Sequence, residues 1–131
     1  MIVVDSSSLL AILLDEPERE SFEAVIAGDE PCVISAFNAH ETACVIRGRH
    51  GPAGVARLWE FLSAAEIEIA PFDDTQVFAA ADAFDRYGKG VNPKARLNMA
   101  DCAAYALAKT MNAPLLFKGA DFPQTDVESF L

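Results

Sequence analysis

The chain has 131 residues, 52% of them hydrophobic, and a formal net charge of −10. This length predicts one domain, residues 1–131, with a core of its own, and the hydrophobic content argues against disorder. The negative charge argues against nonspecific duplex binding, which depends on clustered lysine and arginine, but it does not exclude RNA as a substrate.

Short apolar segments of strand length alternate with segments whose apolar residues recur at helical spacing. Helix starts are marked by N-capping residues such as the serines at 6–8 and Asn98, and a helix end by Gly51-Pro52. In chain order, strands are expected at 2–5, 32–35, 67–69 and 115–117, with a weak fifth strand at 126–128. Between them, helices are expected from about 9 to 13, from Pro17, from 36 to about 49, at 53–65, from 73 or 74 to 84, and from 98 to about 111. This alternation predicts an α/β fold, a parallel sheet with helices on both faces.

Four acids lie beside expected strand ends or in the first turns of expected helices: Asp5, Glu41, Asp101 and Asp121. In open parallel sheets, sites form at the carboxyl ends of the strands, so the four side chains can face one crevice. Converging carboxylates without nearby histidine or cysteine suit a hard cation such as magnesium. A hard cation in a cleft is what phosphodiester cleavage needs.

Each acid also has a purely structural interpretation. Asp5 is placed to cap the helix that follows it, and Ser7 is either another cap or a hydroxyl that supports the carboxylate. Glu41 could be an exposed helix residue, although its mostly apolar neighbours favour burial, where an unpaired carboxylate is costly. From position alone, both interpretations stay open.

The two later acids carry the same ambiguity. Asn98 and Asp101 have the spacing of a capping pair. Asp121 follows a strand, a lysine and a glycine, a setting typical of a turn. Asp126 is a further candidate functional acid nearby. Spacing therefore offers a plausible cluster without proving one.

Four longer segments decide between these interpretations. In order, and over nearly the whole chain, they resemble segments of PIN-domain ribonucleases, in particular VapC-type toxins of bacterial toxin–antitoxin pairs. The segments are IVVDSSSLLAILLDEPE, VISAFNAHETACVI, YGKGVNPKARLNMADCAAYALAK and PLLFKGADFPQTDV. The resemblance implies a three-layer α/β/α fold with five parallel strands in the order 3-2-1-4-5.

The resemblance also implies roles for the acids. Its catalytic carboxylates fall on Asp5, Glu41, Asp101 and Asp121, and its metal ligands on Asp5 and Asp101, with Mg²⁺ as the cofactor and Mn²⁺ as a substitute. Supporting roles are expected for three further residues, namely Ser7, Asn98 and Asp126.

The sequence departs from the family pattern at several positions. Ala100 stands where glycine is usual, which suggests a packing difference. Ala120 stands where asparagine or aspartate is usual, which removes a polar neighbour of Asp121 and ranks that acid last of the four. Asn38 and His40 are unusual for their segment, and the sequence offers no explanation of them.

The expected partners follow from the same resemblance. They are an RNA substrate, a cognate VapB-type antitoxin and a second copy of the chain, in a homodimer or a higher toxin–antitoxin assembly. No apolar run approaches the roughly 20 residues of a membrane-spanning helix, and three cysteines without CxxC spacing fit a reducing cytoplasm. We therefore expect a cytoplasmic protein without a membrane partner.

The sequence thus predicts a magnesium-dependent endoribonuclease that hydrolyses RNA phosphodiester bonds, the toxin of a VapBC-type pair. One alternative is a non-catalytic PIN-like module that acts mainly by binding an antitoxin-like partner. Another is an α/β phosphotransferase with Asp5 as acceptor, although the three serines after Asp5 do not fit such a loop.

Overall fold

A computed structural model describes residues 1–131, and four parallel strands form its single sheet. The strands are β1 (Ile2–Val4), β2 (Cys32–Ser35), β3 (Glu68–Ala70) and β4 (Leu115–Leu116), in the order β3-β2-β1-β4. Strand β1 is central: Ile2 lies opposite Cys32 of β2, and Val3 lies opposite Leu115 of β4. Strands β1, β2 and β4 are entirely buried, as apolar strands covered on both faces should be.

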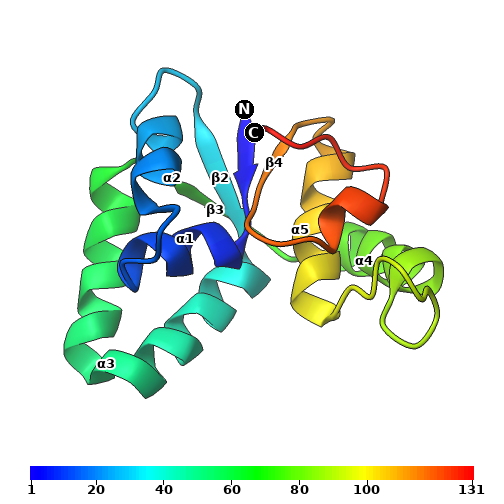
Figure 1. The fold of residues 1–131 in the computed structure, drawn as a ribbon, viewed down its shortest axis with the longest axis horizontal. Coiled ribbons are helices and arrows are strands. Elements are labelled where there is room, and N and C mark those ends of the chain that lie inside the picture. The colour runs from blue at the N-terminus through cyan, green and yellow to red at the C-terminus, as the bar shows by residue number, and fades with distance from the viewer.

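Five α-helices and one 3₁₀-helix cover the sheet. They are α1 (Ser6–Leu13), α2 (Arg19–Ile26), α3 (Ala36–Ala64), α4 (Asp74–Tyr87), α5 (Met99–Thr110) and the 3₁₀-helix Phe122–Gln124. Figure 1 shows α1, α2 and α3 on one side of the sheet and α4 and α5 on the other. The expected three-layer arrangement is therefore confirmed. None of these helices has both the length and the apolar character needed to cross a membrane.

Successive residues of β1 belong to two separate hydrophobic cores, because side chains alternate between the two faces of a strand. Val3 packs with Leu107 and Tyr105 in the core under α4 and α5. Val4 packs with Leu9 in the core under α1, α2 and α3. The central strand is thus fixed from both sides, and the residue that follows it, Asp5, is fixed with it.

The expected fifth strand at residues 126–128 is wrong. The C-terminal segment reaches the free edge of β4 but pairs with it through one parallel bridge, between Leu115 and Ser129. Leu115 N donates to Glu128 O (2.8 Å) and Phe130 N donates to Leu115 O (3.1 Å). Because β4 has only two residues, its edge offers too few main-chain groups for a longer ladder.

Two helix boundaries refine the sequence-based expectations. The predicted break at Gly51-Pro52 lies inside α3, where Gly51 has φ 65° and ψ −165° and separates two helical stretches at a kink. Glycine tolerates this positive φ, and proline suits the start of the second stretch. Helix α2 begins at Arg19 rather than at Pro17.

Candidate functional site

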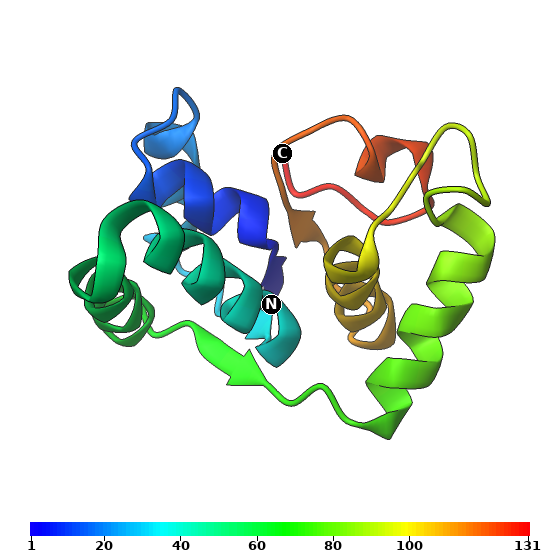
Figure 2. The ribbon, with the colours of Figure 1, turned by 90° about the horizontal axis from the view of Figure 1, so that it is seen from below.

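One edge of the sheet collects the candidate acids. The carboxyl ends of β1 and β2 and the first turns of α1, α3 and α5 lie on the same side of the molecule (Figure 1), and Figure 2 views that side directly. Asp5 follows β1, Glu41 lies near the start of α3, Asp101 lies in the first turn of α5, and Asp121 follows β4 through a short loop. The parallel topology therefore brings the four acids to one place.

Asp5 is the most deeply buried of the four, with 3% of its surface exposed. Its Oδ2 caps α1 by accepting hydrogen bonds from Ser7 N (3.0 Å) and Ser7 Oγ (2.6 Å), while its Oδ1 accepts none. Burial raises the pKa of Asp5 to about 7; the bonds from Ser7 oppose this rise, and the charges of Asp101 and Glu41 add to it. Asp5 is thus a helix cap whose burial disfavours the charged form of its carboxylate.

Asp101 combines the same two properties. It forms a capping box with Asn98: Asn98 N donates to Asp101 Oδ2 (3.0 Å) and Asp101 N donates to Asn98 Oδ1 (2.8 Å). Burial raises the pKa of Asp101, the bond from Asn98 opposes the rise, and the charges of Glu41 and Asp121 add to it. Its Oδ1 makes no hydrogen bond, so this carboxylate also keeps one oxygen for another partner.

Ser7 connects Asp5 to the loop that carries Asp121. Its hydroxyl donates to Asp5 Oδ2 and accepts from Lys118 N at 2.9 Å. The Lys118 ammonium binds Glu16 (3.0 Å), which ties the same loop to the segment after α1. Asp121 is exposed, and its carboxylate makes no hydrogen bond or ion pair. The loop after β4 is therefore held in place at Lys118, while the Asp121 carboxylate that it carries has no partner.

Asp126 stands apart from the four acids. Its carboxylate accepts a hydrogen bond from the Tyr105 hydroxyl and pairs with Lys109 (3.3 Å) and Arg86 (3.7 Å). The hydrogen bond from Tyr105 is the largest cause that lowers the pKa of Asp126; burial opposes it, and the contacts with Lys109 and Arg86 lower the pKa further. The structure thus places Asp126 as an anchor of the C-terminal segment on α4 and α5.

The donor set fits a hard divalent cation in chemical type. No three acidic, histidine or cysteine side chains surround a common point at ligating distance. Magnesium, however, usually keeps several waters and takes one or two carboxylates together with substrate phosphate oxygens. The free Oδ1 atoms of Asp5 and Asp101 meet that requirement, and a cation would offset both the burial of these carboxylates, which is the main cause of their raised pKa values, and the smaller repulsion from their acidic neighbours.

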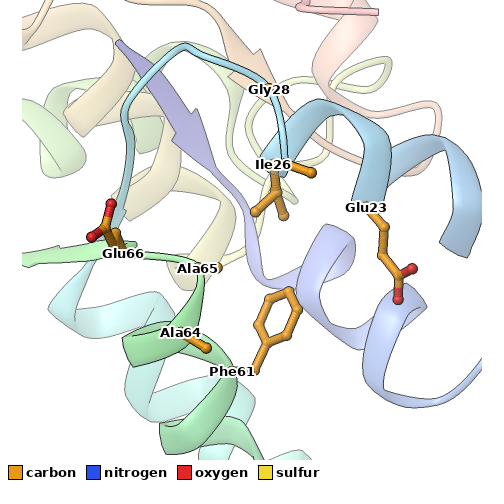
Figure 3. A pocket seen from close by; sticks show the side chains of 8 residues that line it. Glu23, Ile26, Gly28, Phe61, Ala64, Ala65 and Glu66 are labelled. Carbon is orange, nitrogen blue, oxygen red and sulfur yellow. The ribbon is translucent and has the colours of Figure 1, made fainter.

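The surface hollows lie elsewhere. One of about 580 Å³ opens between the end of α2 and the end of α3, lined by apolar side chains such as Phe61 together with Glu23 and Glu66 (Figure 3). None of the five hollows is lined by any of the four acids.

Two residues that the sequence left unexplained have different settings. His40 is exposed, and its Nε2 lies 3.7 Å from Cys44 Sγ. Asn38 is fully buried, and its Nδ2 donates to Ser6 Oγ and to the main-chain oxygen of Ala100. The only sign of Asn38 in the sequence is an amide in an apolar helix segment, three residues before Glu41. Its hydrogen-bond partners are distant in the sequence, so its role could not be inferred from the sequence alone.

Comparisons with known proteins show a clear relationship. The family described as PIN domain matches residues 2–128. Ribonuclease VapC of Mycolicibacterium smegmatis is 44% identical over 126 residues, which cover 96% of this chain and 97% of that protein. Ribonuclease VapC30 of Mycobacterium tuberculosis is 42% identical over 126 residues, with 96% and 95% covered. The resemblance inferred from the four sequence segments is therefore confirmed over nearly the full chain.

Solved structures agree on the fold. VapC20 of Mycobacterium tuberculosis, a Sarcin-Ricin loop cleaving toxin, superposes with a TM-score of 0.80 at 14% identity, covering 97% of this chain and 96% of that one. VapBC2 of Rickettsia felis, bound to a DNA fragment from its promoter, gives a TM-score of 0.77 at 16% identity, with 98% and 96% covered. At these identities the likeness shows the fold alone.

Proposed function

The chain belongs to the PIN-domain family, and from this premise we propose that it is a magnesium-dependent endoribonuclease, the toxin of a VapBC-type toxin–antitoxin pair. The observation that carries the proposal is the gathering of Asp5, Glu41, Asp101 and Asp121 at one sheet edge, close enough for their charges to affect one another. The 44% identity to a protein named Ribonuclease VapC supports RNA as the substrate.

In this proposal Asp5 and Asp101 would hold the cation, because one oxygen of each carboxylate is free of hydrogen bonds. Ser7 keeps the Asp5 carboxylate oriented, and the capping box with Asn98 does the same for Asp101. When bound there, Mg²⁺ would supply positive charge to offset the charge growing on the scissile phosphate and would lower the pKa of an attacking water. Glu41 is half-buried with no hydrogen-bond partner, and is available to orient that water.

The proposed substrate is single-stranded or looped RNA, whose backbone can reach a shallow edge. Lys89, Lys94 and Arg96 lie in the loop directly before α5, are exposed, and form no ion pair. In a chain of net charge −10, we propose that these unpaired cations in the segment before α5 guide phosphates toward the acids.

The proposed protein partner is a VapB-type antitoxin, bound to a homodimer or a higher toxin–antitoxin assembly. The solved neighbour from Rickettsia felis is named as a VapBC2 complex, and this supports a VapB-type partner. An antitoxin segment that presents arginine would complement an acidic edge through charge-assisted hydrogen bonds.

The direct test is cleavage of structured RNA by the antitoxin-free protein with millimolar Mg²⁺ or with chelator. We expect defined fragments with Mg²⁺ or Mn²⁺, and none with chelator, on denaturing gels. Cleavage that persists in chelator would contradict the proposal. Copurification with a small partner but no cleavage after its removal would favour the non-catalytic module.

A second expected result concerns stability. Because a cation would bind the native acids and not the unfolded chain, millimolar Mn²⁺ should raise the melting temperature of the wild-type protein. A gain of about 2.7 kcal/mol is expected at a hundredfold excess over the dissociation constant. Differential scanning calorimetry of wild type and Asp101→Asn checks this, and an equal gain in both proteins would speak against binding at the acids.

A further inference from the structure

Asn38 lies buried where three elements of the acidic edge meet. Its Nδ2 donates one hydrogen bond to Ser6 Oγ (3.1 Å) and another to Ala100 O (2.9 Å). Ser6 Oγ donates in return to the main-chain oxygen of Asn38 (3.2 Å). A single amide therefore joins the first turn of α3 to the start of α1 and to the first turn of α5.

The partners of this amide are the chain neighbours of the two proposed metal ligands. Ser6 directly follows Asp5, and Ala100 directly precedes Asp101. Glu41 lies one helical turn beyond Asn38 on the same helix. Repulsion between these carboxylates pushes α1, α3 and α5 apart, and the two bonds of the amide oppose that push.

Stability of the core alone does not account for an amide at this position. Asn38 is fully buried, and its Oδ1 accepts no hydrogen bond. An unpaired buried acceptor costs about 1–3 kcal/mol. What the amide offers is one nitrogen with two N–H groups, which can serve acceptors on two neighbouring elements, whereas a hydroxyl has only one donor.

We propose that Asn38 is a positioning residue that sets the separation of Asp5 and Asp101 and thereby the affinity of the acidic edge for a divalent cation. The inference rests on the proposed metal-dependent function. Partners that orient metal ligands typically contribute 10–100-fold to metal affinity, and a loss in that range is expected when this amide is removed.

The test titrates Mn²⁺ alone into the full-length protein by calorimetry, without RNA. We expect the dissociation constant for Mn²⁺ to rise at least about tenfold in Asn38→Ala, and less in Ser6→Ala, which removes one of the two bonds. Thr42→Val is the matched control. Its hydroxyl is equally buried but donates to Asn38 O (2.7 Å) within α3, so its loss disconnects no elements.

Cleavage assays on the same proteins supply a second measurement. Asn38→Ala should need more Mg²⁺ for half-maximal activity while its KM for RNA stays within about twofold of wild type, because the amide touches neither substrate nor cation. Combining Asn38→Ala with Ser6→Ala should weaken Mn²⁺ binding by less than the product of the two single effects, since the residues share a bond.

The outcomes separate the inference from the proposed function. An unchanged dissociation constant for Mn²⁺ in folded Asn38→Ala overturns the inference, and so does equal weakening in Thr42→Val. If Asn38→Ala does not fold, Ser6→Ala decides by the same criterion. A wild-type protein that binds no Mn²⁺ would instead overturn the proposed metal site itself, together with the inference that rests on it.

Discussion

Replacement of Asp5 or Asp101 by asparagine should lower the rate of RNA cleavage at least about a hundredfold, the usual scale for loss of one preorganised electrostatic contact. Asparagine keeps the shape of each side chain and still accepts a capping hydrogen bond. The change therefore removes the charge that would hold the cation without removing the start of α1 or α5. Single-turnover cleavage rates at saturating Mg²⁺ measure the effect.

Asp126→Asn is the matched control for these two substitutions. It makes the same chemical change on a carboxylate that pairs with Lys109 and Arg86, away from the four acids. Its cleavage rate should stay within a few-fold of wild type. Near-wild-type rates in both Asp5→Asn and Asp101→Asn, or a loss in Asp126→Asn as large as theirs, would refute the proposed assignment of the acids.

The same Asp5→Asn substitution should stabilise the metal-free protein above pH 7. Burial raises the pKa of Asp5 from 3.8 to about 7, so between these values the folded protein keeps a proton that the unfolded chain has released. The free energy of unfolding of the wild type therefore falls as the pH rises from about 4 to about 7 and then levels off. At about 1.4 kcal/mol for each unit of pKa, the loss is at most about 4 kcal/mol.

Urea unfolding in chelator at pH 5 and pH 8 measures this effect. Asp5→Asn should show a much smaller fall in unfolding free energy between the two pH values than the wild type. Asp126 supplies a contrast of opposite sign: its pKa is lowered, so its contribution is present above its ordinary pKa and is lost as the pH falls. An identical pH dependence in wild type and Asp5→Asn would show that Asp5 is not held in a destabilising environment.

The two Asp5 predictions together describe a residue whose function opposes stability. Natural sites often retain such strain because the chemistry needs it. If the first prediction holds and the second fails, Asp5 is catalytic but adequately solvated. If the second holds and the first fails, Asp5 is buried and strained for another reason, and the cation-binding role must be sought elsewhere.

Local features of this protein follow from the sequence by itself. The cap at Asp5, the capping pair of Asn98 and Asp101, and the break at Gly51 all depend on residues within one turn of one another. Their hydrogen bonds and dihedral angles are set by neighbours in the chain. The alternation of strands and helices likewise implied the parallel sheet, and with it the shared edge of the acids.

The tertiary structure alone decided the rest. The fifth strand did not form because the edge of β4 is two residues long, and Asp126 was drawn to Tyr105 rather than to the other acids. The contacts of Asn38 reach Ser6 and Ala100, 32 and 62 residues away in sequence. Such contacts depend on which side chains meet when the layers pack. The alternation of strands and helices implied a shared sheet edge, but it did not specify the individual hydrogen-bond partners across it.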